Sequence, residues 1–200
     1  MIIEKIDSYD KKRDKVLMDE GLVLLLYKGE IRKLRFKEDM VISDEFYRGT
    51  VLPILVKRAR ERLVYILKNS DKPEAEIRRK YKEGFYPDEA AEAAIEWGKL
   101  HHYIDDARYT DNYIRYHSEG KSARKIMYDL MAKGISKELI EQYLDMAEID
   151  EKSQVTAELR KRHFDPEDAD PAVRRKIAAA LMRKGYSWDT VRSCMNLYED

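Results

Sequence analysis

The pattern of apolar positions changes near residue 43, and the two parts of the chain predict different structures. Before this point, short apolar segments alternate with charged turns that contain Gly or Asp, a pattern typical of strands joined by tight turns. The apolar segments are Ile2–Ile6, Lys15–Met18 and Leu22–Tyr27. We therefore expect residues 1–47 to form a short β-rich segment, arranged as a small meander. The pattern leaves open whether these strands pack on the helices that follow.

From residue 48 onward, apolar residues recur at intervals of three and four, as they do on one face of a helix. The run from Val51 to Leu67 is the clearest example. Pro53 falls in its first turn, where a missing backbone N–H is harmless. Several later helical runs follow an aspartate that can accept hydrogen bonds from the first backbone N–H groups. These predicted caps are Asp71, Asp105, Asp150 and Asp170.

An internal repeat organises the helical part. In each copy an apolar residue, a glycine and a second apolar residue precede the start of a new helix. The glycines are Gly84, Gly134 and Gly185, which lie 50 and 51 residues apart. Glycine is favoured at a helix end because it adopts the left-handed conformation without steric cost. The first copy is one residue shorter before its glycine, so its register is the least certain of the three.

A repeat of about fifty residues has room for three helices of ordinary length and their turns. The sequence therefore predicts a mainly α fold, with three-helix repeats at residues 48–104, 105–149 and 150–200 after the β-rich segment at residues 1–47. Repeats of this kind stack on their neighbours and build an extended surface. We expect an elongated, curved array.

The charge balance limits the classes of partner. The chain has 39 basic and 39 acidic residues and no net charge, whereas a protein that holds bare nucleic acid through its phosphates usually has a basic excess. The single cysteine, Cys194, excludes an internal disulfide and a cysteine-ligated zinc site. The longest apolar run, Leu22–Tyr27, is far shorter than the roughly 20 residues that span a bilayer. We expect a cytoplasmic protein with no membrane contact.

No pattern of catalytic or metal-binding residues stands out. Two histidines and two aspartates lie within residues 101–106, but they straddle a predicted helix end and lack the spacing of helical metal ligands. The segment Gly120–Ser122 resembles the end of a phosphate-binding loop, but Arg115 occupies the position of the required first glycine. The sequence predicts no enzyme activity, metal or cofactor.

Tyrosine accounts for 14 of the 20 aromatic residues. Seven of the aromatic residues fall at apolar positions of the helical part, and we expect these in the core. They are Tyr81, Phe85, Trp97, Tyr103, Tyr109, Tyr113 and Trp188. In contrast, Tyr116, Tyr128 and Tyr143 are expected to be partly exposed, and exposed tyrosine among charged residues is typical of a protein-binding surface.

The paired helices also resemble helix-turn-helix units, whose second helix reads the major groove of DNA. In the second copy, Lys133–Ser136 would be the turn. The helix after it carries Glu138, Glu141 and Asp145, and phosphate groups would repel these side chains. A structural helical hairpin is the better interpretation of this copy, and direct DNA binding through tandem units is the alternative.

Together, these features resemble the RecX family, which regulates the RecA recombinase. Tyr103–Tyr109 (YIDDARY) is similar to the family signature of two Asp residues flanked by aromatic and aliphatic residues. The stretch from Gly120 to Ile135 matches the part of the family that follows this signature. The helix at Glu76–Tyr81 and the turn at Arg183–Ser187 are similar to the first and last repeats. Three residues depart from the family pattern: His102 and Ser122 replace glycines, and Tyr81 replaces a leucine.

The resemblance implies a non-enzymatic regulator that binds the RecA filament on single-stranded DNA. It implies inhibition of recombinase, ATPase and co-protease activity, in homologous recombination, DNA repair and the SOS response. A monomer is expected, with a weak direct DNA contact as a possibility. Basic clusters that recur in each repeat are the candidate partner-binding residues. They are Lys121, Arg124 and Lys125, then Arg78, Arg79, Arg174 and Arg175.

Overall fold

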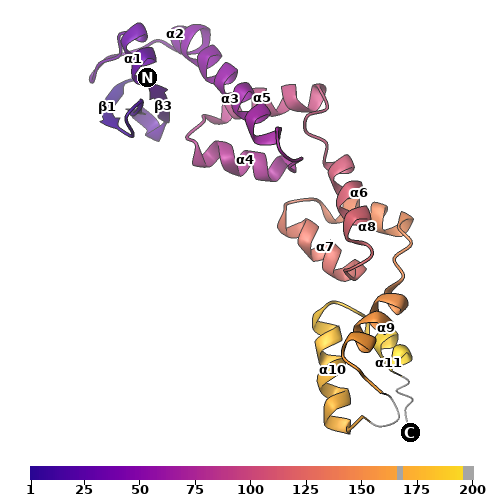
Figure 1. Cartoon of the computed structure of the whole chain (residues 1–200). Coiled ribbons are helices and arrows are strands. Elements are labelled where there is room, and N and C mark those ends of the chain that lie inside the picture. Colours follow the sequence, from indigo (N-terminus) through magenta and orange to yellow (C-terminus); the bar gives the residue numbers. More distant parts are fainter. Residues whose placement is uncertain (166–168, 196–200) are drawn as a thin grey trace. The chain divides into compact units, whose positions relative to one another are not determined.

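The computed structural model describes residues 1–165 and 169–195. Its contacts divide the chain into two compact units, Met1–Asp105 and the part that begins at Asp106. The fold is mainly helical, with a small sheet at the N-terminus, as predicted (Figure 1). No helix in the described part of the chain has the length and apolarity needed to cross a membrane. The elongated, curved arrangement of repeats stays a prediction.

The predicted meander is present. Three strands form an antiparallel sheet in the order β1-β2-β3, with Val16 opposite Ile6 on one side and Leu24 on the other. The β1–β2 turn is held by Asp10, whose Oδ1 accepts hydrogen bonds from the backbone N–H groups of Lys12 and Arg13, both at 2.8 Å. The strands are β1 (Ile3–Ser8), β2 (Arg13–Met18) and β3 (Val23–Tyr27).

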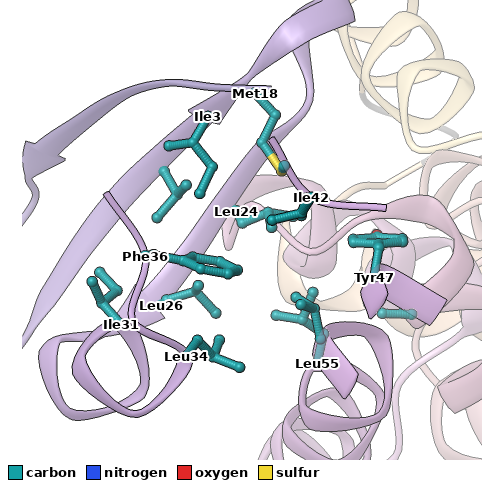
Figure 2. Close-up of a cluster of buried hydrophobic side chains, with 13 residues drawn as sticks. Ile3, Met18, Leu24, Leu26, Ile31, Leu34, Phe36, Ile42, Tyr47 and Leu55 are labelled. Carbon is teal, nitrogen blue, oxygen red and sulfur yellow. The ribbon is translucent and has the colours of Figure 1, made fainter. Parts of the chain in front are cut away.

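The strands pack on the helices, which answers the question that the sequence left open. Their inward residues form one buried cluster with Leu55 of α3, with Ala90 of α5 and with Val51, the residue just before α3. Figure 2 shows Ile3, Met18 and Leu24 pointing toward the side of the cluster that holds Tyr47 and Leu55. The helices of this unit are α1 (Lys28–Leu34), α2 (Asp44–Phe46), α3 (Leu52–Leu67), α4 (Glu74–Glu83) and α5 (Asp88–Leu100).

The long helix begins earlier than predicted. Helical structure starts at Asp44, where Ser43 Oγ accepts a hydrogen bond from the Phe46 N–H at 3.1 Å. A π-helical turn, Tyr47–Val51, then leads into α3. Pro53 therefore lies in the first turn of α3, as predicted, but within a longer helical segment. A proline there cannot donate to the preceding turn, and a π-turn is one way in which helices accommodate such an interruption.

Each group of three helices has its own core, as tandem repeats require. Ala59 of α3, Tyr81 of α4 and Ile95 of α5 share one cluster. In the second unit, Ile126 and Leu130 lie in one cluster, and Leu159 and Leu181 in another. The helices of this unit are α6 (Asp106–His117), α7 (Ala123–Ala132), α8 (Lys137–Met146), α9 (Glu151–Lys161), α10 (Pro171–Arg183) and α11 (Trp188–Cys194).

The repeated turn is confirmed, with one correction. Gly134 and Gly185 adopt the left-handed conformation with φ of 87° and 95°. In the first copy the left-handed residue is Phe85, with φ of 55°, whereas Gly84 has φ of −87°. The three copies therefore align without a gap. In each, the residue after the left-handed one donates its backbone N–H to a carbonyl five residues earlier: Tyr86 to Tyr81, Ile135 to Leu130, and Tyr186 to Leu181.

Two of the predicted caps are confirmed and one is wrong. Asp150 accepts a hydrogen bond from the Ser153 N–H at 3.0 Å, and Asp170 accepts one from the Ala172 N–H at 2.6 Å. Asp71 does not cap α4, because Pro73 occupies the N-cap position. The cap at Asp105 stays a prediction.

Candidate protein-interaction surface

The predicted basic cluster of the second repeat lies at the start of α7. Ser122 is the N-cap of this helix, and its Oγ accepts a hydrogen bond from the Lys125 N–H at 3.2 Å. Gly120 lies between α6 and α7. This start of α7 brings Lys121 and Lys125 to the same side, toward Asp129 one turn further along the helix.

Lys121 and Lys125 are neutralised within the repeat. Lys121 Nζ lies 2.8 Å from Asp129 Oδ2, and Lys125 Nζ lies 2.7 Å from Asp129 Oδ1. Lys121 also donates a hydrogen bond to the Tyr113 hydroxyl at 3.1 Å. Burial alone would raise the pKa of Asp129, but the hydrogen bonds from the two lysines outweigh this effect and lower it to about 2. These lysines therefore stabilise the packing of α6 against α7, which we call the joint between the two helices.

A ladder of rings along α6 covers the same joint. The rings of Tyr109 and Tyr113 stack at 6.2 Å, and His117 follows 4.2 Å from Tyr113. Lys133 Nζ lies 5.8 Å from the Tyr113 centroid, within the range of a cation–π contact. Burial and then the charge of Lys121 lower the pKa of His117, which favours the neutral ring that packs against Tyr113.

Arg124 belongs to a different face of α7. Its Nη2 donates a hydrogen bond to the Tyr128 hydroxyl at 3.3 Å. Tyr128 is 55% exposed, and Met131, one turn further along, is 44% exposed. We call Arg124, Tyr128 and Met131 the exposed α7 face. Arginine, tyrosine and methionine are enriched in protein–protein interfaces.

The third repeat has an equivalent face on α10. Because Leu181 follows Leu130 by 51 residues in the aligned turns, Arg175 and Met182 occupy the positions of Arg124 and Met131. A shallow groove of about 450 Å³ runs along this helix to α11. It is lined by Pro171, Arg174, Arg175, Ala178, Ala179, Met182 and Trp188. We call this set the α10 groove.

Arg78 and Arg79 of α4 differ from each other. Arg78 Nε donates to Glu74 at 2.7 Å, and its Nη2 donates to Glu92 of α5 at 2.9 Å. The hydrogen bonds to Glu92 and Glu74 raise the pKa of Arg78 above its ordinary value. Arg78 thus joins two helices. Arg79 lies on the surface, 3.8 Å from Glu83.

The core predictions for the aromatic residues are partly wrong. Tyr81 is buried, and its hydroxyl donates to the Ala59 carbonyl at 2.8 Å. Trp188 and Tyr103, however, are 45% and 44% exposed. Tyr103 lies just after the end of α5, and Trp188 is the first residue of α11. At such ends an apolar position in the sequence does not have to face the core. Tyr116 is 84% exposed and Tyr128 is 55% exposed, as expected.

Among the described residues, no three His, Cys, Asp or Glu side chains are grouped so that they could hold a metal ion.

The helix α8 carries acidic side chains, and Lys137 at its start is 3.3 Å from Glu141. A helix with this charge pattern is poorly suited to lie against DNA phosphates.

Comparison with known proteins places the chain in a family. Two sequence-family models, for the second and third three-helix domains of RecX, match residues 105–144 and 150–195. The regulatory protein RecX of Clostridium acetobutylicum is 25% identical, over 94% of this chain and 92% of its own. That of Finegoldia magna is 28% identical, over 99% of this chain and 100% of its own. The chain belongs to the RecX family.

A crystal structure of a regulatory protein RecX has the same fold, with a TM-score of 0.65 over 98% of each chain at 19% identity. The glycine positions of the family pattern can now be compared with the backbone. His102, which replaces a family glycine, has φ of 56°, so this RecX protein places a histidine in a conformation that glycine adopts more easily. Ser122, at the second such position, has φ of −64° and is the N-cap of α7.

Proposed function

We propose that this RecX protein is a non-enzymatic regulator that binds the RecA filament on single-stranded DNA. Binding would lower the recombinase, ATPase and co-protease activity of the filament, in DNA repair and the SOS response. The observation that carries the proposal is the similarity to regulatory RecX proteins along nearly the whole chain. A cytoplasmic location follows from this role, because the filament forms on chromosomal DNA.

The chemistry of the exposed faces supports a protein partner. The exposed α7 face and the α10 groove combine arginine with methionine and an aromatic ring, which suits a protein surface better than a row of phosphates. Lys121 and Lys125 are already paired with Asp129. Arg124, Arg175 and Arg174 are therefore the stronger partner-binding candidates in the second unit, and Arg79 is the stronger candidate in α4.

ATP hydrolysis by RecA on single-stranded DNA tests the proposal. The protein is added in increasing amounts to RecA filaments that are already assembled, and the hydrolysis rate is followed. We expect the rate to fall as the protein approaches the concentration of RecA. An unchanged rate at equal concentrations would refute the proposed regulation.

The alternative, direct DNA binding by tandem helix-turn-helix units, predicts a different result. Such binding would occur without RecA and would weaken steeply with salt, since each phosphate contact releases counterions. Binding to duplex DNA, measured at two salt concentrations in the absence of RecA, separates the two functions. Strong, salt-sensitive binding there would favour the alternative.

A further inference from the structure

A polar pocket of about 480 Å³ lies in the first unit, between the β-meander and the helices α3 and α4. Basic side chains from three elements line it: Arg13 from β2, Arg58 and Arg62 from α3, and Lys80 from α4. The remaining lining residues are Leu25, Tyr27, Glu61, Glu83, Gly84 and Tyr86. Neither of the exposed faces of the second unit contributes to this pocket.

Arg58 is held rigidly at the pocket wall. Its Nη1 donates to the Leu25 carbonyl at 2.9 Å and to Glu30 Oε2 at 3.1 Å, and its guanidinium lies 4.6 Å from the centre of the Tyr27 ring. The side chain is only 13% exposed. Both hydrogen bonds that Arg58 makes within the described residues use Nη1. Its Nε and Nη2 groups can therefore donate hydrogen bonds to a ligand in the pocket.

The positive charge of the pocket is only partly compensated. Arg13 pairs with Asp10 at 2.7 Å, and Arg58 pairs with Glu30. Within the part of the chain that the structure describes, Arg62 and Lys80 make no ion pair.

The two carboxylates in the lining do not cancel this charge. Glu61 is paired with Lys57 at 4.0 Å, and Glu83 with Arg79 at 3.8 Å. Both partners are surface cations outside the pocket lining. The lining therefore retains a local excess of positive charge, although the chain as a whole has none.

Tyr86 adds a neutral donor to the pocket. Its hydroxyl makes no hydrogen bond within the described residues, and its ring packs edge-on against Tyr81 at 5.2 Å. Burial raises the pKa of Tyr86, whereas Arg58, Arg62 and Arg13 oppose that rise. These three arginines and Tyr86 line the same pocket.

We propose that this pocket binds a phosphate group, with Arg58, Arg62 and Lys80 as the cationic partners and the Tyr86 hydroxyl as a further donor. Arginine donates to phosphate oxygens through its planar fork, and lysine adds a mobile point charge. Two sources share this chemistry: a free nucleotide and the backbone of a single strand of nucleic acid. The site goes beyond the proposed regulation of RecA and does not depend on it.

The test uses the full chain without RecA and three probes: inorganic phosphate, thymidine monophosphate, and a fluorescent single-stranded oligothymidine of about twelve nucleotides. Calorimetry measures the first two and fluorescence anisotropy measures the third, at low salt. The variant R62Q/K80Q removes the two unpaired cations. The control R60Q/K82Q removes one exposed cation from each of the same two helices, outside the pocket. Tyr86→Phe removes the hydroxyl alone.

We expect R62Q/K80Q to weaken binding about tenfold and the control to weaken it less than about twofold. Loss for thymidine monophosphate would identify a free nucleotide, and loss for the oligonucleotide alone would identify a strand. Tyr86→Phe should weaken the same probe by a smaller factor. If no probe binds, or if R62Q/K80Q and the control bind equally well, the proposal is wrong. Neither result alters the test with RecA.

Discussion

The hydroxyl of Ser122 donates a hydrogen bond to the Lys184 carbonyl at 2.9 Å, and this bond joins the second group of helices to the third. Ser122 is fully buried. Next to it, Gly185 has φ of +95°, and a Cβ placed on this residue would lie 2.5 Å from Ser122 Oγ. The contact therefore depends on a residue without a side chain at position 185.

The first prediction concerns this contact. Gly185→Ala combines a positive φ with a clash, so we expect the free energy of unfolding to fall by about 2–3 kcal/mol. Gly21→Ala is the matched control, because Gly21 has φ of +78° but nothing within 4 Å of an added Cβ. It should cost only about 1 kcal/mol. Equal losses in urea unfolding of the two variants would show that the contact with Ser122 is not tight.

The second prediction concerns Asp129 and its two lysines. The pKa of about 2 lies below the ordinary 3.8, so the ionised carboxylate stabilises the folded state above pH 4. This stabilisation is lost as the pH falls from about 4 toward 2. Asp129→Asn should lower the free energy of unfolding by about 1–2 kcal/mol at pH 7, because the exposed lysines are partly screened by solvent.

The control for Asp129 is Asp111→Asn, which removes a surface ion pair with Arg115 at 3.0 Å. It should cost less than about 0.5 kcal/mol. Urea unfolding at pH 7 and at pH 3 gives the comparison. If Asp129→Asn loses as much stability between these pH values as the unmodified protein does, Asp129 is not the group responsible for that part of the acid sensitivity.

The third prediction concerns left-handed residues at helix ends. His163 follows α9 with φ of 50°, a conformation that costs a non-glycine residue about 1–2 kcal/mol. His163→Gly removes this strain but makes the unfolded chain more flexible, so we expect a net stabilisation of about 0.5–1 kcal/mol. His101 is also at a helix end but has φ of −97°, and His101→Gly should destabilise the protein. A thermal melt of both variants checks the opposite signs.

The fourth prediction concerns the exposed faces. R124E/R175E reverses one arginine on the exposed α7 face and one in the α10 groove, and we expect it to weaken inhibition of RecA ATP hydrolysis by about tenfold. The control R115E/R160E reverses one exposed arginine on α6 and one on α9. It should inhibit almost as well as the unmodified protein. Equal inhibition by both variants would exclude the two faces from the interface.

These arginines give a cleaner test than the cluster suggested by the sequence. Reversing Lys121, Arg124 and Lys125 together would place two carboxylates where Asp129 now has its ion-pair partners. Repulsion among three carboxylates would then destabilise the joint between α6 and α7. A loss of inhibition in that triple variant would mix unfolding with loss of contact.

The sequence predicts the helical repeats well because their signals are local. Left-handed glycines at Gly134 and Gly185 and the caps at Asp150 and Asp170 depend only on nearby backbone. Aligning the copies by their glycines shifts the first copy by one residue. In that copy the left-handed position, which glycine occupies in the other two, holds Phe85.

Candidate binding residues were harder to judge from the sequence, because ion pairing depends on tertiary contacts. Nothing in the spacing of Arg78 and Glu92 indicates that they pair across two helices. The pocket at Arg58 brings together residues from β2 to α4, and no local motif marks it. The core prediction for Trp188 is wrong because its apolar character says nothing about its exposure at the first position of α11.

The most direct measurement of the central claim is binding of the labelled protein to RecA filaments on immobilised single-stranded DNA, compared with the same DNA without RecA. We predict that the protein binds the filament at least tenfold more tightly than it binds bare DNA. A tenfold difference in Kd corresponds to about 1.4 kcal/mol of binding free energy, which contacts with RecA would supply. Equal binding to the filament and to bare DNA would contradict the account, because the partner would then be the nucleic acid.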